Sequence, residues 1–134
     1  MKRKPYIAIA VGVFLYVILI SVSYLFAQTP DSKGIYQEGL IESVASLLAW
    51  FLPALIAGSI TREKPIIVGV VLGLLMVTLD FGAAAMAFGW EWAVALLGVF
   101  PGSQIFLVVS AIAFSFAGWK IRGLNSRATK SNVA

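Results

Sequence analysis

The chain contains no cysteine and no histidine. Without cysteine there is no disulfide, no thiol nucleophile and no thiolate ligand for a metal. Without histidine the commonest general base, the commonest transition-metal ligand and the usual switch at neutral pH are missing too. No pair of carboxylates has a catalytic spacing either. We therefore expect a non-enzymatic protein with no catalytic residue, no metal and no cofactor.

Charged residues are also scarce. They make up 12% of the 134 residues, against roughly a quarter in soluble domains, and 60% of the chain is hydrophobic. The mean hydropathy is +0.96. Such a chain is expected to fold in lipid, and its length leaves no room for a separate soluble part. We predict one polytopic membrane domain covering residues 1–134.

Four apolar runs are long enough to cross a bilayer, because about 20 helical residues span a hydrocarbon core of about 30 Å. They cover about residues 6–27, 40–60, 66–88 and 93–118. The fold predicted is an all-α membrane protein with four transmembrane helices in an antiparallel up-down bundle. The first run also fits a signal peptide with a cleavage site near Ser21-Val22-Ser23. It is longer than a usual signal core and more spans follow, which favours an anchor.

Short polar segments separate these runs. Residues 28–39 have the composition of a loop, and residues 61–65 form a tight basic turn whose Pro65 suits the first turn of the next helix. The segment Gly89-Trp90-Glu91-Trp92 is predicted to be a hairpin turn at the membrane surface. The tail, residues 120–134, is rich in Ser, Asn and Thr, and we expect it to fray in water.

The basic residues indicate an orientation. If the runs alternate across the membrane, nine of the ten Lys and Arg residues fall on one side and only Lys33 on the other. The nine are Lys2, Arg3, Lys4, Arg62, Lys64, Lys120, Arg122, Arg127 and Lys130. This distribution predicts a multi-pass protein of the cell (inner) membrane with both termini in the cytoplasm. It also explains the net charge of +4 without a nucleic-acid partner.

Asp80 is the residue most in need of explanation. It lies about eight residues from the outer end of its span, hence roughly 12 Å below that interface, and no span contains a Lys or Arg to neutralise it. An ionised Asp near a helix centre costs about 3 kcal/mol. We therefore expect the neutral, protonated form, which donates a hydrogen bond.

Other polar side chains share the outer half of the predicted bundle with Asp80. Glu42 and Ser46 lie on one face of the second span, and Ser103 and Gln104 follow Pro101, which we expect to interrupt the fourth span. With Asp80 these four side chains are predicted to surround an intramembrane polar site. Two interpretations stay open: the site serves ion-coupled transport, or Asp80 is a structural acid bonded to a neighbour such as Ser46 or Gln104.

Small residues predict where helices approach closely. Gly69 and Gly73 form a GxxxG pattern on the same face as Asp80, and we expect this face to meet the small and polar face of the second span. The first span has no polar face of this kind, so we expect it to pack at the periphery of the bundle.

Two functions remain from these patterns. The leading interpretation is a non-enzymatic membrane protein that acts through helix packing, as a homo-oligomer or as an accessory subunit beside another membrane protein in the lipid bilayer. The alternative is a proton- or cation-coupled carrier or channel for small solutes that uses Asp80.

Overall fold

The computed structural model describes residues 5–25, 40–99 and 101–133, and these ranges are helical apart from short turns. The helices are α1 (Pro5–Leu25), α2 (Leu40–Ile60), α3 (Pro65–Phe88), α4 (Trp90–Val99) and α5 (Pro101–Val133). Four of them, α1, α2, α3 and α5, are long and apolar enough to cross a membrane. The prediction of an all-α bundle with four long apolar helices is confirmed. The chain is a multi-pass membrane protein.

The turn between α2 and α3 is tight because of two residues. Lys64 takes a left-handed conformation with φ 56°, and Pro65 then occupies the first turn of α3, where the missing N–H is not needed. Pro53 lies inside α2 and is buried, and the helix continues through it from Leu40 to Ile60. This turn brings α2 and α3 back to the same end of the bundle.

The fourth apolar run is interrupted at Pro101, as predicted, but its two parts are separate helices. Residues 93–118 do not form one helix: α4 ends at Val99 and α5 begins at Pro101. Trp90 is already helical, so only Gly89, with φ 92°, makes the turn after α3. At 10 residues, α4 is about 15 Å long and too short to cross a bilayer. The rings of Phe81 and Trp90, 5.2 Å apart and nearly perpendicular, hold α4 against α3.

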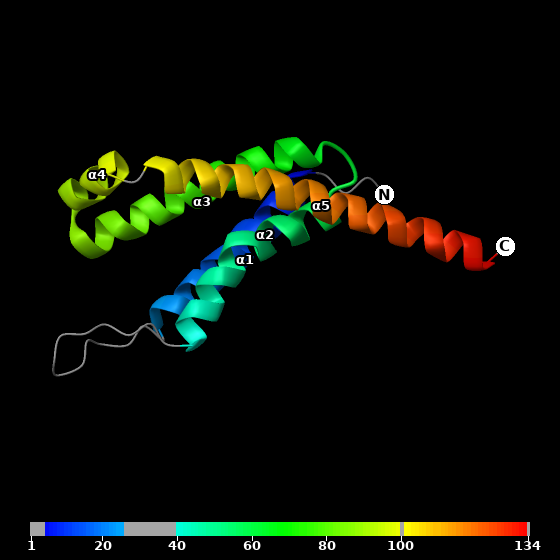
Figure 1. Cartoon of the computed structure of the whole chain (residues 1–134), viewed down its shortest axis with the longest axis horizontal. Helices are drawn as coiled ribbons and strands as arrows, with labels where there is room; N and C mark the ends of the chain where they lie inside the picture. The colour runs from blue at the N-terminus through cyan, green and yellow to red at the C-terminus, as the bar shows by residue number, and fades with distance from the viewer. Residues whose placement is uncertain (1–4, 26–39, 100, 134) are drawn as a thin grey trace.

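The long helices form two pairs set at an angle (Figure 1). In that view α1 and α2 run together, while α3 and α5 run together in a different direction. The pairs meet at the end that carries the turn of residues 61–64, which we call the closed end. They separate toward the opposite end, where α4 lies, which we call the splayed end.

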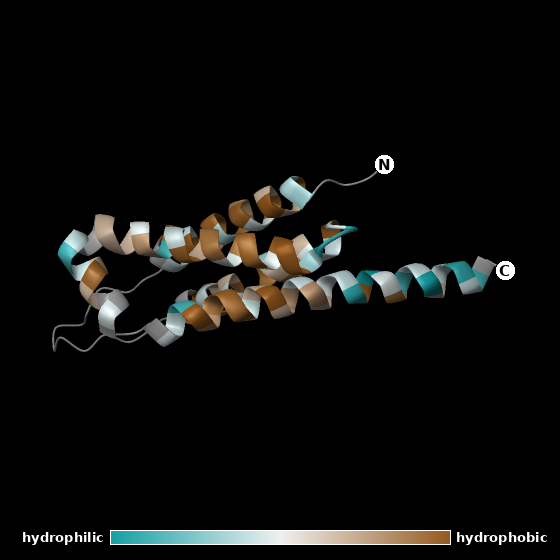
Figure 2. Cartoon of the chain, turned by 90° about the horizontal axis from the view of Figure 1, so that it is seen from above, coloured by the Kyte–Doolittle hydropathy of each residue, from teal (hydrophilic) through white to brown (hydrophobic). Residues whose placement is uncertain are grey.

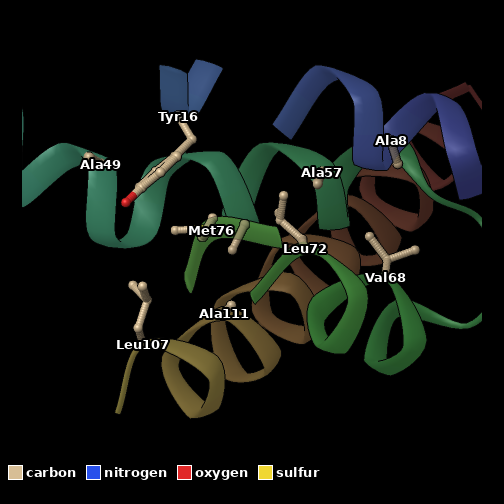
Figure 3. Close-up of a cluster of buried hydrophobic side chains, with 10 residues drawn as sticks. Ala8, Tyr16, Ala49, Ala57, Val68, Leu72, Met76, Leu107 and Ala111 are labelled. Atoms are coloured by element: carbon tan, nitrogen blue, oxygen red, sulfur yellow. The ribbon is translucent and has the colours of Figure 1, made fainter. Parts of the chain in front are cut away.

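An apolar core joins the two pairs over the first part of their length. Figure 3 shows side chains from four helices meeting, among them Tyr16 of α1, Ala57 of α2, Leu72 of α3 and Ala111 of α5. The expectation that the first span packs peripherally is wrong. Tyr16 is only 4% exposed, and a Cβ atom added to Gly12 of α1 would lie 2.8 Å from the side chain of Leu72.

Glycines bring the backbones together at the closed end. A Cβ atom added to Gly58 of α2 would clash with the backbone oxygen of Ser115 in α5. One added to Gly118 of α5 would clash with the backbone oxygen of Leu55 in α2. Because no larger side chain fits between these backbones, each glycine is required by the α2–α5 crossing.

Three side chains of α5 close this end with hydrogen bonds to backbone oxygens. Ser115 Oγ donates to the oxygen of Pro65 (2.9 Å), and Trp119 Nε1 donates to that of Arg62 (3.2 Å). Arg122 Nη1 donates to the oxygens of Ser59 and Ile60 at 2.6 and 3.2 Å. The last carbonyls of α2 have no partner within their own helix, so Arg122 supplies the C-terminal cap from another helix.

Beyond Trp119, α5 leaves the bundle as a polar helix (Figure 2). The expectation that this tail frays is wrong, since α5 stays helical to Val133. Its hydroxyl groups donate to carbonyls of their own helix, as Ser126 does to Gly123 at 2.9 Å and Thr129 to Asn125 at 2.9 Å. These bonds reduce the competition that Ser and Thr offer to helical backbone.

Candidate functional site

The apolar core ends at a layer of polar side chains near the splayed end. Its last apolar residues include Met76 of α3 and Leu107 of α5, both buried. One turn beyond them, α3 carries Asp80 and α5 carries Gln104, and the two side chains are hydrogen bonded. They meet because α3 and α5 are antiparallel neighbours, so residues at the same height face each other.

This pair leaves one polar atom unsatisfied. The carboxyl oxygens of Asp80 accept from the Gln104 amide nitrogen, the only donor that a Gln side chain has. Among the residues that the structure describes, no donor reaches Gln104 Oε1, although this atom is buried. An unpartnered amide oxygen in lipid is costly, because no water is present to replace the missing donor.

The other helix pair carries its own polar contact. Ser23 of α1 and Ser46 of α2 are joined through their hydroxyl oxygens at 2.8 Å, and Ser23 is only 8% exposed. We use "polar layer" for the four residues Ser23, Ser46, Asp80 and Gln104. The residues predicted to surround one site are thus distributed over two contacts, one in each helix pair. The structure pairs Ser46 with Ser23 and Asp80 with Gln104.

The remaining predicted members of the site lie at its margin. Ser103 is exposed at the start of α5, next to Gln104. Glu42 lies in the first turn of α2, and its side chain lies outside the part of the chain that the structure describes. No group of three His, Cys, Asp or Glu side chains that could hold a metal occurs within the described ranges.

The predicted packing residues face a different helix from the one expected. A Cβ atom added to Gly69 would lie 2.7 Å from Cα of Ile112, and one added to Gly73 would lie 3.0 Å from Cα of Val108. Both contacts are with α5, whereas the sequence pattern suggested α2. The spacing marks a face that tolerates no side chain but does not say which neighbour covers it.

Comparison with protein-family models, curated proteins and solved structures finds no match for this chain. The function is therefore argued from the polar layer and its surroundings.

The Asp80–Gln104 pair has a specific chemical capability. A protonated carboxyl group carries one O–H donor, and an amide carries both an N–H donor and an oxygen acceptor. If Asp80 is protonated and donates to Gln104 Oε1, the two groups form a ring of two hydrogen bonds. If Asp80 is ionised, that oxygen needs a donor from outside the chain's own described residues. The two side chains can therefore satisfy each other's hydrogen bonds, or Gln104 Oε1 can accept a hydrogen bond from a further donor.

Proposed function

We propose that this protein is a small non-enzymatic protein of the cell (inner) membrane that acts through helix packing, as an oligomer of identical chains or as an accessory subunit of a membrane complex. The observation that supports this proposal is the polar layer at the splayed end. Asp80 is only partly buried there, and its partner Gln104 retains an unpartnered oxygen. The exposed part of Asp80 is unfavourable in lipid, so a second protein surface that covers it is stabilised.

A second copy of the chain suits this surface. Asp80 is partly exposed, and its protonated carboxyl group contains both a donor and an acceptor, so two copies related by a twofold axis can each bond to the carboxyl group of the other. Exposed apolar side chains continue the surface on both helices, among them Leu79 of α3 and Ile105 of α5. Such side chains pack equally well against lipid or protein, which leaves the polar pair to decide where the copies meet.

The alternative function is a proton- or cation-coupled carrier or channel. The observation that favours it is the same acid, because carboxyl groups within membrane helices commonly take part in ion pathways. Under this proposal water or an ion, rather than protein, contacts the exposed part of Asp80. The two functions differ in what covers the splayed end.

The variant Asp80→Asn distinguishes the packing function from the carrier or channel function. Asn keeps the size of the side chain and a hydrogen-bond donor but cannot exchange a proton or carry a charge. The purified chain and the variant are reconstituted into vesicles, and proton and cation fluxes are measured together with thermal stability. The packing proposal predicts a stable variant and no flux through either protein. A flux through the wild type that disappears in a stable Asp80→Asn protein would contradict the packing proposal and establish the alternative.

The proposal includes an orientation with both termini in the cytoplasm. It is supported by the distribution of cations, since every Lys and Arg of the described residues lies at the closed end. Reporter fusions after Lys64 and at the C-terminus should be cytoplasmic, and a reporter inserted between Pro30 and Gly39 should be external. A cytoplasmic location of the reporter in that loop would contradict the proposed orientation.

A further inference from the structure

A basic pocket lies where α5 leaves the bundle. It has a volume of about 650 Å³ and lies between the turn after α2 and the protruding part of α5. Five cationic side chains line it: Arg62, Lys120, Arg122, Arg127 and Lys130. Among the residues that the structure describes, no acidic side chain lines it, although Glu63 belongs to the same turn. Five positive charges around one hollow produce a potential that attracts an anion.

Arg122 gives this pocket a fixed cation. Its Nη1 atom donates to the backbone oxygens of Ser59 and Ile60, which holds the side chain at the C-terminus of α2. These two bonds use one of the three nitrogens of the guanidinium group, which has five N–H donors in a rigid plane. That geometry matches the oxygens of a phosphate group, and a side chain already held in place loses little entropy on binding.

An apolar groove adjoins the pocket on the other side of Arg122. It has a volume of about 420 Å³, and its apolar lining comes from Leu55, Ile56 and Ile60 of α2 and from Ile121 of α5. Arg122 lines both the groove and the basic pocket. A ligand that fills both hollows must carry a negative group beside a hydrocarbon chain.

The position relative to the membrane favours the same kind of ligand. Trp119 lines the basic pocket, and its indole N–H donates to the oxygen of Arg62 at the end of the bundle. Tryptophan side chains gather at the headgroup level of membranes, where one side of the ring is apolar and the other wet. The part of the groove lined by Leu55 and Ile56 therefore lies toward the hydrocarbon, and the five cations lie toward the phosphates.

We propose that the basic pocket and the apolar groove together bind one anionic phospholipid, with its phosphate headgroup among the five cations and an acyl chain along α2 and α5. Basic hollows at the ends of transmembrane helices bind such headgroups through charge and hydrogen bonds together. This site is separate from the polar layer at the splayed end and does not depend on the proposed function.

The test is native mass spectrometry of the full chain in detergent, titrated with phosphatidylglycerol or with phosphatidylcholine. Phosphatidylglycerol should bind at least about ten-fold more tightly, and excess inorganic phosphate should not displace it. Equal affinity for the two lipids would overturn the proposal. Displacement by inorganic phosphate would overturn it too, because the site would then take a soluble anion.

Variants locate the binding on this surface. Arg127 and Lys130 are exposed on the protruding helix, so Arg127→Gln with Lys130→Gln should leave the fold intact and weaken phosphatidylglycerol binding by about 25-fold, about five-fold for each cation. The control is Lys64→Asn, which removes a cation at the same end outside the pocket; Asn tolerates the left-handed conformation there. Arg127→Gln alone should weaken binding about five-fold, and an equal loss in Lys64→Asn would reduce the effect to net charge and contradict the proposed site.

Discussion

The helices of this bundle pack closely at the closed end and loosely at the splayed end. At the closed end, glycines such as Gly58 and Gly118 bring backbones into contact, and Arg122 satisfies the last carbonyls of α2. At the splayed end, Gly82, Gly98 and Gly102 have open space where a side chain would be, and the helices carry polar groups instead. The helix–helix contacts of the closed end are complete within one chain. The splayed end is where a partner, water or an ion has something to add.

This difference predicts where substitutions harm folding and where they affect function. Lipid provides no hydrophobic driving force between helices, so close packing and hydrogen bonds hold the pairs together. Those interactions are concentrated around α5 at the closed end. The largest losses of stability are therefore expected there, and losses should decrease toward the splayed end.

The largest effect is expected for Gly58→Ala. Its Cβ atom would overlap the backbone oxygen of Ser115, so α2 and α5 must move apart, at a cost of more than about 3 kcal/mol. Thermal unfolding in detergent measures this loss. Gly82→Ala is the matched control, because nothing lies within 4 Å of its added atom and Ala is the better helix former. Equal stability of the two variants would show that the closed end is not closely packed.

A smaller loss is expected at the α3–α5 contact. Gly69→Leu would press a side chain against the Cα atom of Ile112, a backbone contact at 2.7 Å that is less severe than the overlap at Gly58, and should cost about 2 to 3 kcal/mol. The same thermal measurement applies, with Gly82→Leu as the control. If Gly69→Leu leaves expression and melting unchanged, that face of α3 meets lipid and not α5.

Arg122→Gln tests the cap of α2. The variant loses charged hydrogen bonds to the oxygens of Ser59 and Ile60, and we expect a loss of about 2 kcal/mol. Arg127→Gln, on the protruding part of the same helix, should change stability by less than about 0.5 kcal/mol. Similar losses in both variants would assign the effect to net charge rather than to the cap.

The smallest effect is expected for the serine contact of the polar layer. Removing either hydroxyl of the Ser23–Ser46 pair should cost about 0.6 kcal/mol, the usual value for a hydrogen bond between membrane helices. A double-mutant cycle with Ser23→Ala and Ser46→Ala measures the coupling directly. A coupling energy above about 2 kcal/mol would show that this end contributes as much to folding as the closed end.

The sequence was sufficient for the long apolar helices because a run of about 20 uncharged residues has few alternatives in lipid. Pro101 indicated that the fourth run is interrupted, but it did not indicate that the two parts are separate helices, since apolar residues stand on both sides of the break. The helical tail was missed because Ser and Asn favour turns in general, while here hydroxyl bonds to the helix backbone accommodate them.

The candidate site was predicted in part. Asp80 was identifiable because a lone acid deep in an apolar run is costly, and Gln104 because antiparallel neighbours place it at the same height. Ser23 was missed, since the first span has no polar face that singles it out. Three further residues act only through contacts with helices that are distant in sequence: Gly58, Gly118 and Arg122. Their roles were not predicted, because the sequence of one helix does not show which residues of another helix lie against it.

The central claim is that protein covers the splayed end at Asp80, and one measurement tests it most directly. The chain has no cysteine, so a single introduced thiol reports one position. Ala84→Cys lies one turn beyond Asp80 on the same face of α3, and Ala113→Cys, exposed on α5, is the control. Oxidation in membranes should link Ala84→Cys chains into dimers and leave Ala113→Cys monomeric. No dimer, together with rapid labelling of Ala84→Cys by a membrane-impermeant thiol reagent, would show that water reaches this face and would contradict the account.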